Sequence, residues 1–352
     1  MTDGRFGFGI IGCGVIAPTH VKGIKACDEA ELVACCDIDE EKGKAFAAAH
    51  GDIAFYADYL QMVADPKVDV VCVCTPSGLH AECAIAAAEA GKHVFCEKPL
   101  DIDRDRMTAM VAACRKADVK LGCVFQSRTQ PDNIKIRKAI ASGKLGEMTL
   151  GDAFLKDYRS RAYYASAGWR GTWALDGGGA LMNQGVHGID LLLWLMNDDV
   201  ERVFARAEHK VRDIEVEDTC VACLQFKSGA FGTIIGTTSC NPGETRRIEL
   251  HGDVGTIIST GNKITRWAIA EDADARAKNV EPDAQDVEEG TTGDNKAVGS
   301  QGHEFLVNDL VQAIKEDRDP YIIGESARKA VDLILAIYES ARTGKDVPVV
   351  SG

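Results

Sequence analysis

Short apolar runs alternate with alanine-rich helical patterns along the first 125 residues of the chain. The runs that are typical of strands cover residues 6–11, 32–36, 68–74, 93–96 and 120–125. Helical patterns lie between them, near residues 16–26, 40–50, 80–90 and 103–116. Because the strands are apolar on both faces, helices must cover both sides of the sheet. The pattern therefore predicts a doubly wound parallel sheet of the α/β class.

The pattern changes after about residue 126. A helix is expected over 132–141, a strand over 147–155 and a strongly apolar helix over 180–196. Alternating runs follow at 200–211, 219–226, 230–239 and 247–251, and short turns separate them, which is typical of an antiparallel sheet. Helical patterns over 304–315 and 326–342 end the chain. We therefore predict two domains, residues 1–125 and residues 126–352, the second being an α+β domain with a largely antiparallel open sheet.

The composition is that of an ordinary globular protein, with 352 residues of which 45% are hydrophobic and 27% charged. Disordered and collagen-like classes are thereby excluded. The 13 cysteines are odd in number and irregularly spaced, which argues against a disulfide framework. Cys220 and Cys223 form a C-x-x-C, but the alternation of a strand would place them on opposite faces. We expect no metal or redox site there.

The chain is acidic, with 40 Lys and Arg against 54 Asp and Glu and a formal charge of −14. No basic run is present, so we expect no nucleic-acid partner. Residues 271–295 are strongly acidic, which indicates a solvated loop. The N-terminus has no signal-peptide pattern, and no window approaches the roughly 18 apolar residues of a membrane span. These features predict a cytoplasmic protein with no membrane partner.

The first predicted strand ends in a glycine-rich turn, Gly12-x-Gly14-x-x-Ala17, in which Val15 and Ile16 precede the alanine. The turn has the context that a dinucleotide fingerprint requires, a strand before it and a helix after it. The first glycine permits the tight turn, the second lets a pyrophosphate approach the backbone, and the small alanine lets the helix pack closely. We expect these five residues to hold the pyrophosphate at the helix N-terminus.

The second predicted strand ends at Asp37, 20 residues beyond Ala17 (37 − 17). A carboxylate at this place accepts hydrogen bonds from the adenosine ribose hydroxyls and repels a 2′-phosphate. No arginine follows Asp37 directly. The sequence therefore favours NAD over NADP. A simple helix cap would explain Asp37 alone, but not the glycine turn before it.

Two further strand ends carry candidate chemistry, because ligands bind outside the carboxyl ends of such strands. Thr75 and Pro76 follow one strand, and Glu97-Lys98-Pro99 follow the next. A lysine beside a positively charged nicotinamide would have its pKa lowered, which suits proton transfer. The alternative for Lys98 is an ordinary surface lysine.

In the second half, Asn183 and His187 are four residues apart and share one face of the predicted apolar helix. The alternative for His187 is a hydrogen-bonded core residue. An aromatic and arginine-rich stretch before this helix resembles a pocket wall, because aromatic rings stack on sugars and arginine binds carboxylate or phosphate. Packing at a domain interface is the alternative for its residues. The candidates for substrate contact there are Arg159, Tyr163, Trp169 and Arg170.

Taken together, these residues resemble the Gfo/Idh/MocA family of sugar oxidoreductases over nearly the whole chain. The resemblance rests on the glycine turn, Asp37, residues 75–80 ending in His80, the tripeptide Glu97-Lys98-Pro99, residues 187–190 and the C-terminal helix. Within the family, residues 169–187 are most similar to UDP-N-acetylglucosaminuronate 3-dehydrogenases and related sugar or glycoside 3-dehydrogenases.

The resemblance implies a Rossmann domain over residues 1–125. Residues 126–352 would then bind a carbohydrate and form a homo-oligomer, a dimer or tetramer, through the open sheet face. It also implies NAD-dependent hydride transfer at a sugar ring hydroxyl, for which the subgroup indicates C3, with Lys98 and His187 at the reacting carbon. The nicotinamide end of the crevice would be lined by Thr75, Pro76, His80, Glu97, Lys98 and Gln126. No metal is expected.

The chain departs from the family pattern at one position. Many members carry an aspartate four residues before the histidine, where this chain has Asn183. An amide cannot act as a base, so the base is either His187 alone or Lys98, and Asn183 is expected to orient a neighbouring hydroxyl.

Two other functions stay open. One is a glycosidase or lyase that retains its NAD and uses transient oxidation at C3. The other is a non-catalytic regulator that binds NAD and a sugar. The joint presence of Lys98 and His187 argues against the regulator, because a sensor needs no proton-transfer pair.

Overall fold

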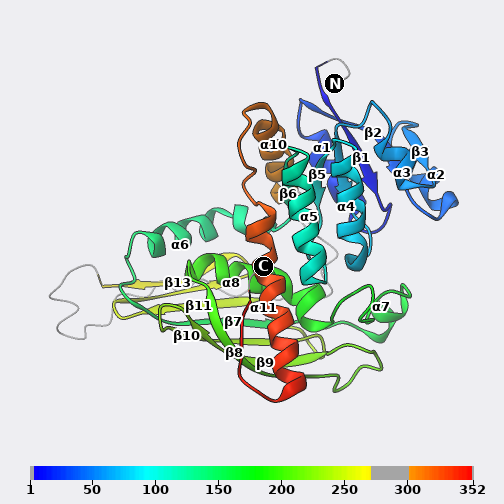
Figure 1. The fold of residues 1–352 in the computed structure, drawn as a ribbon. Helices are drawn as coiled ribbons and strands as arrows, with labels where there is room; N and C mark the ends of the chain where they lie inside the picture. Colours follow the sequence, from blue (N-terminus) through cyan, green and yellow to red (C-terminus); the bar gives the residue numbers. More distant parts are fainter. Residues whose placement is uncertain (1–3, 271–300, 351–352) are drawn as a thin grey trace. The chain divides into compact units, whose positions relative to one another are not determined.

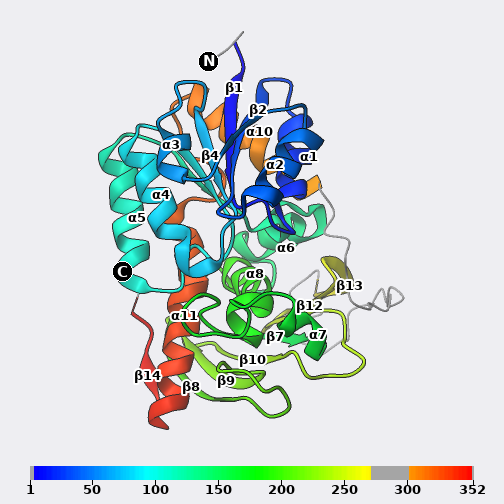
Figure 2. The same ribbon diagram turned by 90° about the vertical axis from the view of Figure 1, so that its right-hand side faces the viewer.

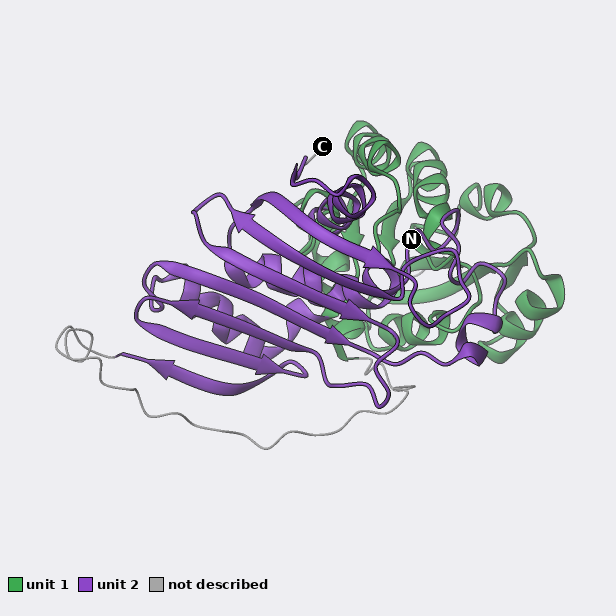
Figure 3. Cartoon of the chain, turned by 90° about the horizontal axis from the view of Figure 1, so that it is seen from below, with its two compact units in different colours: residues 1–126, 297–328, 352 green, residues 127–296, 329–351 purple. Residues whose placement is uncertain are grey.

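The computed structural model describes residues 4–270 and 301–350. They form two compact units (Figure 3). Unit 1 contains residues up to 126 together with 301–328, and unit 2 contains residues 127–270 and 329–350. The acidic segment 271–295, for which a solvated loop was expected, lies outside the described residues.

A six-stranded parallel sheet forms the centre of unit 1 (Figures 1 and 2). Its strands are β1 (Phe6–Ile11), β2 (Ala30–Cys36), β3 (Ala54–Tyr56), β4 (Val70–Val73), β5 (His93–Cys96) and β6 (Leu121–Cys123). Their order in the sheet is β3-β2-β1-β4-β5-β6, so the winding reverses between β1 and β4. This arrangement confirms the predicted doubly wound sheet, and a ligand is expected at the reversal point.

Helices connect the strands of unit 1, as the alternating pattern predicts. They are α1 (Ala17–Lys25), α2 (Glu40–Ala49), α3 (Tyr59–Val63), α4 (His80–Glu89) and α5 (Arg104–Lys116). Aspartate side chains cap α2, α3 and α5 by accepting backbone N–H bonds at their first turns. The three-residue strand β3, at the edge of the sheet, was not predicted because it is too short to show a periodic pattern.

Helix α10 (Gln301–Lys315) belongs to unit 1, although the chain reaches it only after most of unit 2. It packs closely on α1: a Cβ added to Gly23 would lie 3.2 Å from the carbonyl oxygen of His303. Its apolar side chains Leu306, Val307 and Leu310 are buried. An amphipathic helix must bury its apolar stripe, and α1 offers a partner. The predicted boundary, with everything after residue 125 in the second domain, therefore does not hold for residues 301–328.

An eight-stranded, largely antiparallel sheet forms unit 2, in the order β13-β12-β11-β7-β10-β9-β8-β14. The strands are β7 (Met148–Lys156), β8 (Val200–Glu208), β9 (Thr219–Phe226), β10 (Phe231–Thr237), β11 (Arg247–Gly252), β12 (Gly255–Thr260), β13 (Lys263–Ile269) and β14 (Val347–Pro348). Only the β7–β10 pair among them is parallel. The α+β class is confirmed.

Helices cover one face of this sheet, namely α6 (Pro131–Ala141), α8 (Val186–Met196) and α11 (Gly324–Thr343) (Figure 1). Strand β9 alternates between buried and exposed residues, which is typical of a sheet with one covered face. Cys220 is buried and Cys223 is exposed, so the two cysteines lie on opposite faces as predicted. In Figure 3 no helix of the described residues covers the second face.

Across residues 4–270 and 301–350, no helix is both long enough and apolar enough to cross a bilayer.

Candidate functional site

The glycine turn after β1 has the geometry that a bound pyrophosphate needs. Gly12 has φ +94°, and a Cβ there would lie 2.6 Å from the carbonyl oxygen of Cys74, so only glycine fits. A Cβ at Gly14 would meet nothing within 4 Å, which leaves the backbone open to a ligand. Ala17 is fully buried at the start of α1, and no side chain caps the N–H groups of this helix. The turn therefore fits a dinucleotide phosphate.

Val15 and Ile16 complete this turn. Val15 is 90% exposed, so its backbone lies at the surface beside the helix start. Ile16 directly precedes α1 as its N-cap residue, and its side chain makes no capping bond. Both positions agree with backbone contact to a phosphate rather than with a side-chain role.

Asp37, directly after β2, is a buried and ionised carboxylate. Its Oδ2 atom accepts hydrogen bonds from the backbone N–H of Cys13 at 2.9 Å and from Nζ of Lys42 at 2.8 Å. Its Oδ1 atom accepts the N–H of Asp39 at 3.0 Å. Burial alone would raise the pKa of Asp37, but these hydrogen bonds outweigh burial and the pKa lies below its usual value. An ionised carboxylate at this place suits a ribose diol.

Lys42 was not among the sequence candidates. It lies on the first turn of α2, five residues after Asp37, and forms an ion pair with it. The sequence did offer a signal for Lys42, because it follows the predicted ribose ligand Asp37 by only five residues. The ion pair places a cation beside the expected ribose site, although no arginine follows Asp37 in the sequence.

His80 joins the two strand ends that were expected at the nicotinamide. Its Nδ1 atom lies 2.7 Å from the carbonyl oxygen of Pro99, and its Nε2 atom lies 3.0 Å from that of Thr75. The side chain is only 1% exposed. The expectation that His80 lines the crevice is therefore corrected. The side chain is buried, and its hydrogen bonds connect the backbone at Thr75 to the backbone at Pro99.

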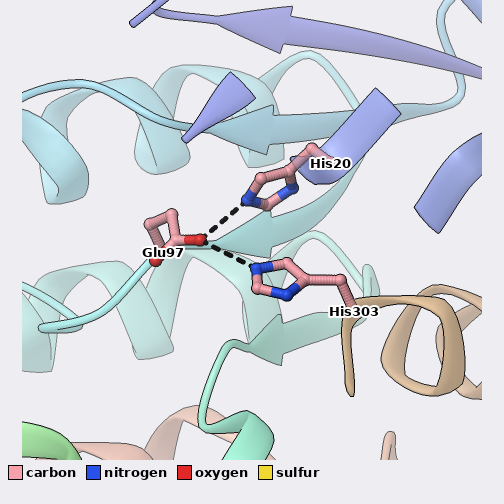
Figure 4. Close-up of side chains that lie close together, drawn as sticks. All are labelled: His20, Glu97 and His303. Atoms are coloured by element: carbon pink, nitrogen blue, oxygen red, sulfur yellow. Dashed lines mark hydrogen bonds and ion pairs between the residues drawn. The ribbon is translucent and has the colours of Figure 1, made fainter. Parts of the chain in front are cut away.

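Glu97 also points into the protein (Figure 4). Its Oε1 atom accepts hydrogen bonds from His20 on α1 at 2.9 Å and from His303 on α10 at 3.3 Å. Its Oε2 atom accepts the backbone N–H of Lys98 at 3.1 Å. Burial opposes ionisation, but the two histidines hold the pKa of Glu97 well below its usual range. The expected crevice role is corrected here too, because the buried carboxylate fixes the backbone of half-buried Lys98 instead.

His20, Glu97 and His303 are also residue types that bind zinc, and their ligand atoms lie within 4.8 Å of one another. A metal-bound histidine usually donates its second ring N–H to an acceptor. Within the described residues, Nδ1 of His20 and Nδ1 of His303 have no hydrogen-bond partner. Burial lowers the pKa of His20, so its neutral ring donates to Glu97 through Nε2. The geometry favours a hydrogen-bonded cluster over a metal site.

Gln126 follows β6 at the end of unit 1, beside the start of α10. A Cβ added to Gly302 would lie 2.4 Å from Cβ of Gln126. This contact fixes the backbone at the end of the Rossmann sheet.

In unit 2, a π-helical turn over Ala180–Gly185 precedes α8, where a continuous helix was expected over 180–196. The carboxylate of Glu217 caps this turn, because it accepts the N–H groups of Gly179 at 3.0 Å and Leu181 at 2.8 Å. The N–H of Ala180 is bonded to the backbone oxygen of Glu217. The first N–H groups of a helix have no acceptor within it, so Glu217 fixes the start of the turn. The turn carries Asn183.

A hydrogen-bonded network joins four of the expected substrate residues. Asn183 donates through Nδ2 to Asp176, a buried carboxylate. Gln184 donates to Oδ1 of Asn183 at 2.9 Å and to the hydroxyl of Tyr163 at 2.8 Å. The remaining members are Arg159, which donates to Oε1 of Gln184 at 2.7 Å, and Arg170, which donates to the Tyr163 hydroxyl.

Trp169 and His187 complete the candidate residues of unit 2. The guanidinium of Arg170 lies 4.7 Å from the ring centre of Trp169 and 4.2 Å from that of Tyr163. His187 is half-buried in the first turn of α8. The next residue, Gly188, lets α8 approach β7, since a Cβ there would lie 2.2 Å from a methyl group of Leu155. Close helix packing therefore fixes the position of His187.

Two family models match this chain. Residues 6–125 match the oxidoreductase family with the NAD-binding Rossmann fold, and residues 134–258 match the GFO/IDH/MocA C-terminal domain. The chain belongs to the GFO/IDH/MocA oxidoreductase family. The resemblance inferred from the sequence and the expected NAD cofactor are confirmed.

Solved and curated GFO/IDH/MocA relatives span most of the chain. The WlbA dehydrogenase from Bordetella pertussis, solved in complex with NADH and UDP-GlcNAcA, is 33% identical, with 99% of each chain covered and a TM-score of 0.87. Myo-inositol 2-dehydrogenase from Thermotoga maritima is 31% identical over 75% of this chain and 78% of its own length. D-glucoside 3-dehydrogenase from Escherichia coli is 30% identical over 66% and 68%, respectively.

Each unit of this family member brings part of the candidate site together. In unit 1, the turn residues, Asp37 and the Lys98 backbone lie at the carboxyl edge of the sheet. In unit 2, the network gathers Arg159, Tyr163, Arg170 and Asn183. Sequence reasoning missed the residues that support them, which are His20, Lys42, Asp176, Gln184, Glu217 and His303.

Proposed function

We propose that the protein is an NAD-dependent dehydrogenase that oxidises a secondary hydroxyl of a sugar ring, with C3 as the favoured position. The observation that carries the proposal is Lys98, whose backbone is fixed by Glu97 at the carboxyl end of β5 in an NAD-binding Rossmann unit. The relatives named as inositol and glucoside dehydrogenases support it, because each name describes a ring alcohol as substrate.

Residues of unit 1 bind and orient the cofactor in this proposal. NAD, when bound, accepts the hydride. Backbone groups from Gly12 to Ala17 hold the pyrophosphate, and Asp37 holds the ribose. Thr75, Pro76 and Gln126 line the nicotinamide end. His80 and Glu97 are buried and fix the backbone of Thr75, Lys98 and Pro99 through hydrogen bonds.

The proposed proton chemistry uses Lys98 and His187. The ammonium of Lys98 polarises the substrate oxygen, and His187 accepts the hydroxyl proton. Lys98 remains the alternative base. Asn183 cannot take a proton, and its amide, held by Asp176 and Gln184, orients the neighbouring hydroxyl. Arg159, Tyr163, Trp169 and Arg170 hold the sugar.

The first experiment measures NADH formation by absorbance with purified protein and a panel of inositols, free hexoses, uronates, simple glycosides and sugar nucleotides, each with NAD or NADP. The proposal expects NADH with at least one ring alcohol. Release of aglycone from a glycoside without net NADH would replace it by the closed-cycle glycosidase. Tight NAD binding with no reaction on any substrate would favour the regulator.

Lys98→Met should lower kcat by about a thousandfold, because the substitution removes proton transfer and oxygen polarisation together. NAD affinity, measured by fluorescence titration, should stay within about twofold of the wild type. Lys92→Met, a substitution on the loop before β5, is the matched control and should retain full activity. A Lys98→Met protein that lost only NAD affinity would contradict the role proposed for this lysine.

We also propose that the open face of the unit 2 sheet forms a homo-oligomer. Phe204, Val221 and Phe231 are 39%, 48% and 60% exposed, and their strand pairings put them on this face. Contiguous exposed apolar residues mark interaction surfaces. Val221→Lys should therefore shift the mass measured by light scattering from the oligomer to the monomer. Wild-type protein that is already monomeric at micromolar concentration would contradict this proposal.

A further inference from the structure

Three side chains on the open face of the unit 2 sheet are residue types that bind metals. They are Asp152 on β7 and Glu249 and His251 on β11, and their ligand atoms lie within 4.8 Å of one another. Strand pairing puts Asp152 directly opposite Glu249. Ile248 and Leu250 are buried, so the alternation of β11 turns Glu249 and His251 to the open face (Figure 3). We call these three residues the carboxylate–histidine cluster.

The ring of His251 has the support that a metal ligand needs. Oγ1 of Thr256 lies 3.0 Å from its Nδ1 atom, and the two residues are paired across β11 and β12. A proton on Nδ1, donated to this hydroxyl, leaves Nε2 able to bind a metal, as in most metal-bound histidines. Within the described residues, His20 and His303 lack a partner at Nδ1. The criterion that argues against a metal at Glu97 therefore favours one here.

The spacing of His251 and Glu249 fits an ion between them better than a direct hydrogen bond. Nε2 of His251 lies 3.6 Å from Oε2 of Glu249, which is beyond hydrogen-bond distance. Two ligands of a tetrahedral zinc ion, with bonds of about 2.0–2.1 Å, lie roughly 3.4 Å apart. Arg247 forms an ion pair with the other oxygen of Glu249, Oε1, at 2.7 Å. The Oε2 atom is therefore the one left for a metal.

Asp152 adds a carboxylate that the protein pairs only in part. It is 6% exposed, and its Oδ1 atom accepts the hydroxyl of Thr233 at 2.6 Å. Its Oδ2 atom has no hydrogen-bond partner in residues 4–270 and 301–350. Buried charges are normally paired or bound to metals, and a cation beside Asp152 and Glu249 would relieve the repulsion between the two carboxylates. The side chains of Glu249 and His251 are 19% and 28% exposed, so an ion can reach the cluster from the open face.

We propose that the carboxylate–histidine cluster binds one zinc ion on the open face of unit 2. One imidazole nitrogen and two carboxylate oxygens are zinc ligands, and water completes the tetrahedron. Magnesium and calcium prefer oxygen ligands alone, so the imidazole selects against them. The two carboxylates and the guanidinium of Arg247 leave one net negative charge, which favours a cation. The ion would join β7 to β11 and stabilise the sheet, and this role does not depend on the proposed dehydrogenase.

The test is calorimetric titration of the full chain, freed of metals by a chelator, with zinc chloride. We expect about one zinc ion per chain with a dissociation constant of roughly micromolar or below, and magnesium should bind at least about a hundredfold more weakly. Cobalt(II) at the site should show the visible absorption of nitrogen and oxygen ligands. A thiolate charge-transfer band would instead place the metal at a cysteine such as exposed Cys223. That band, or no zinc binding, would overturn the proposal.

Variants locate the ion. His251→Ala and Asp152→Asn should each weaken zinc binding by at least about a hundredfold because each removes a ligand, and Thr256→Val should weaken it by about tenfold. Asp152 is buried, so its variant could fail to fold, but His251 is partly exposed and its loss spares the core. His209→Ala, which removes an exposed histidine of unit 2, is the matched control and should bind zinc like the wild type. Unchanged zinc affinity in His251→Ala would overturn the assignment.

The rival metal site among the described residues is the cluster of His20, Glu97 and His303. His303→Gln should leave zinc affinity unchanged. Loss of zinc binding in His303→Gln, with full binding in His251→Ala, would move the ion to that cluster and overturn the proposal. Zinc should also raise the Tm of the wild type but not that of His251→Ala, because a ligand that binds only the folded state stabilises it. An equal rise in both proteins would contradict the proposed site.

Discussion

At the scale of single residues, the ion pair between Asp37 and Lys42 lies at the position where the proposed adenosine ribose binds. The carboxylate accepts Nζ of Lys42 at 2.8 Å and thereby neutralises a cation that lies beside the expected ribose. We therefore expect NAD preference to depend on two effects of Asp37, namely its repulsion of a 2′-phosphate and its neutralisation of the Lys42 ammonium. Removing the carboxylate would expose the lysine.

Asp37→Ser should lower kcat/KM for NAD by about tenfold and raise that for NADP, because the released ammonium of Lys42 then attracts the 2′-phosphate. The double variant Asp37→Ser/Lys42→Gln should lose the gain with NADP but keep the loss with NAD. Steady-state kinetics with both cofactors and one substrate measures the ratio. If the single variant gains nothing with NADP, Lys42 does not reach the phosphate.

At the scale of elements, Glu217 caps the start of the turn that carries Asn183. Its carboxylate is buried and accepts two backbone N–H groups together with the hydroxyl of Tyr338 at 2.9 Å. Burial raises the pKa of Glu217 to about 7, and the hydrogen bonds only partly offset this effect. The folded protein therefore holds a proton here that the unfolded chain has already released.

Between pH 4.5, the ordinary value for this carboxyl group, and about pH 7, the folded state binds more protons than the unfolded state. The contribution of Glu217 to the free energy of unfolding therefore falls as the pH rises through this window, by up to roughly 3 kcal/mol. Glu217→Gln should remove this fall. Urea unfolding of the wild type and the variant at both ends of the window measures the difference, with exposed Glu41→Gln as control. Parallel pH profiles for wild type and Glu217→Gln would rule out the effect.

The second element of interest is α10, which delivers His303 to Glu97. His303→Ala should lower kcat by about tenfold, because Glu97 loses one of its two imidazole donors and holds the Lys98 backbone less firmly. His303→Gln keeps an N–H donor and should recover most of the activity.

If His303 had only a structural role, His303→Ala and His303→Gln would both be less stable, and kcat would not recover in His303→Gln. Thermal unfolding and kcat are therefore measured on the same samples. His303→Ala with wild-type kcat would show that α10 does not position Lys98.

At the scale of the whole molecule, the pattern of apolar residues was sufficient to predict both sheets, but it did not predict all of their strands. The both-face apolar runs predicted the parallel sheet, and the alternating runs predicted β8 to β11. Strands β3 and β14 have three and two residues, too few for a periodic signal. Strands β12 and β13 extended the antiparallel sheet further than predicted.

The candidate site shows the same limit. The residues that were predicted lie in local motifs, such as the glycine turn. Two of the residues that were missed act across long separations: His303 and Glu97 are 206 residues apart, and Glu217 and Leu181 are 36 apart. A single sequence gives no signal for such pairs, because neither partner stands in a periodic pattern that points to the other. Glu97 was correctly placed at a strand end, but whether its side chain pointed inward depended on His20 and His303, which are 77 and 206 residues away.

The discontinuity of unit 1 also has a consequence for synthesis. Domains near the N-terminus usually fold first as the chain leaves the ribosome. Here the nascent chain up to residue 126 lacks α10, so the face of α1 that packs against it stays exposed and Glu97 lacks one imidazole. Unit 1 therefore stays incomplete while most of unit 2 is translated. Unit 1 can be completed only after α10 (residues 301–315) has been synthesised, so the maturation of the nucleotide site depends on a segment that follows most of unit 2 in the chain.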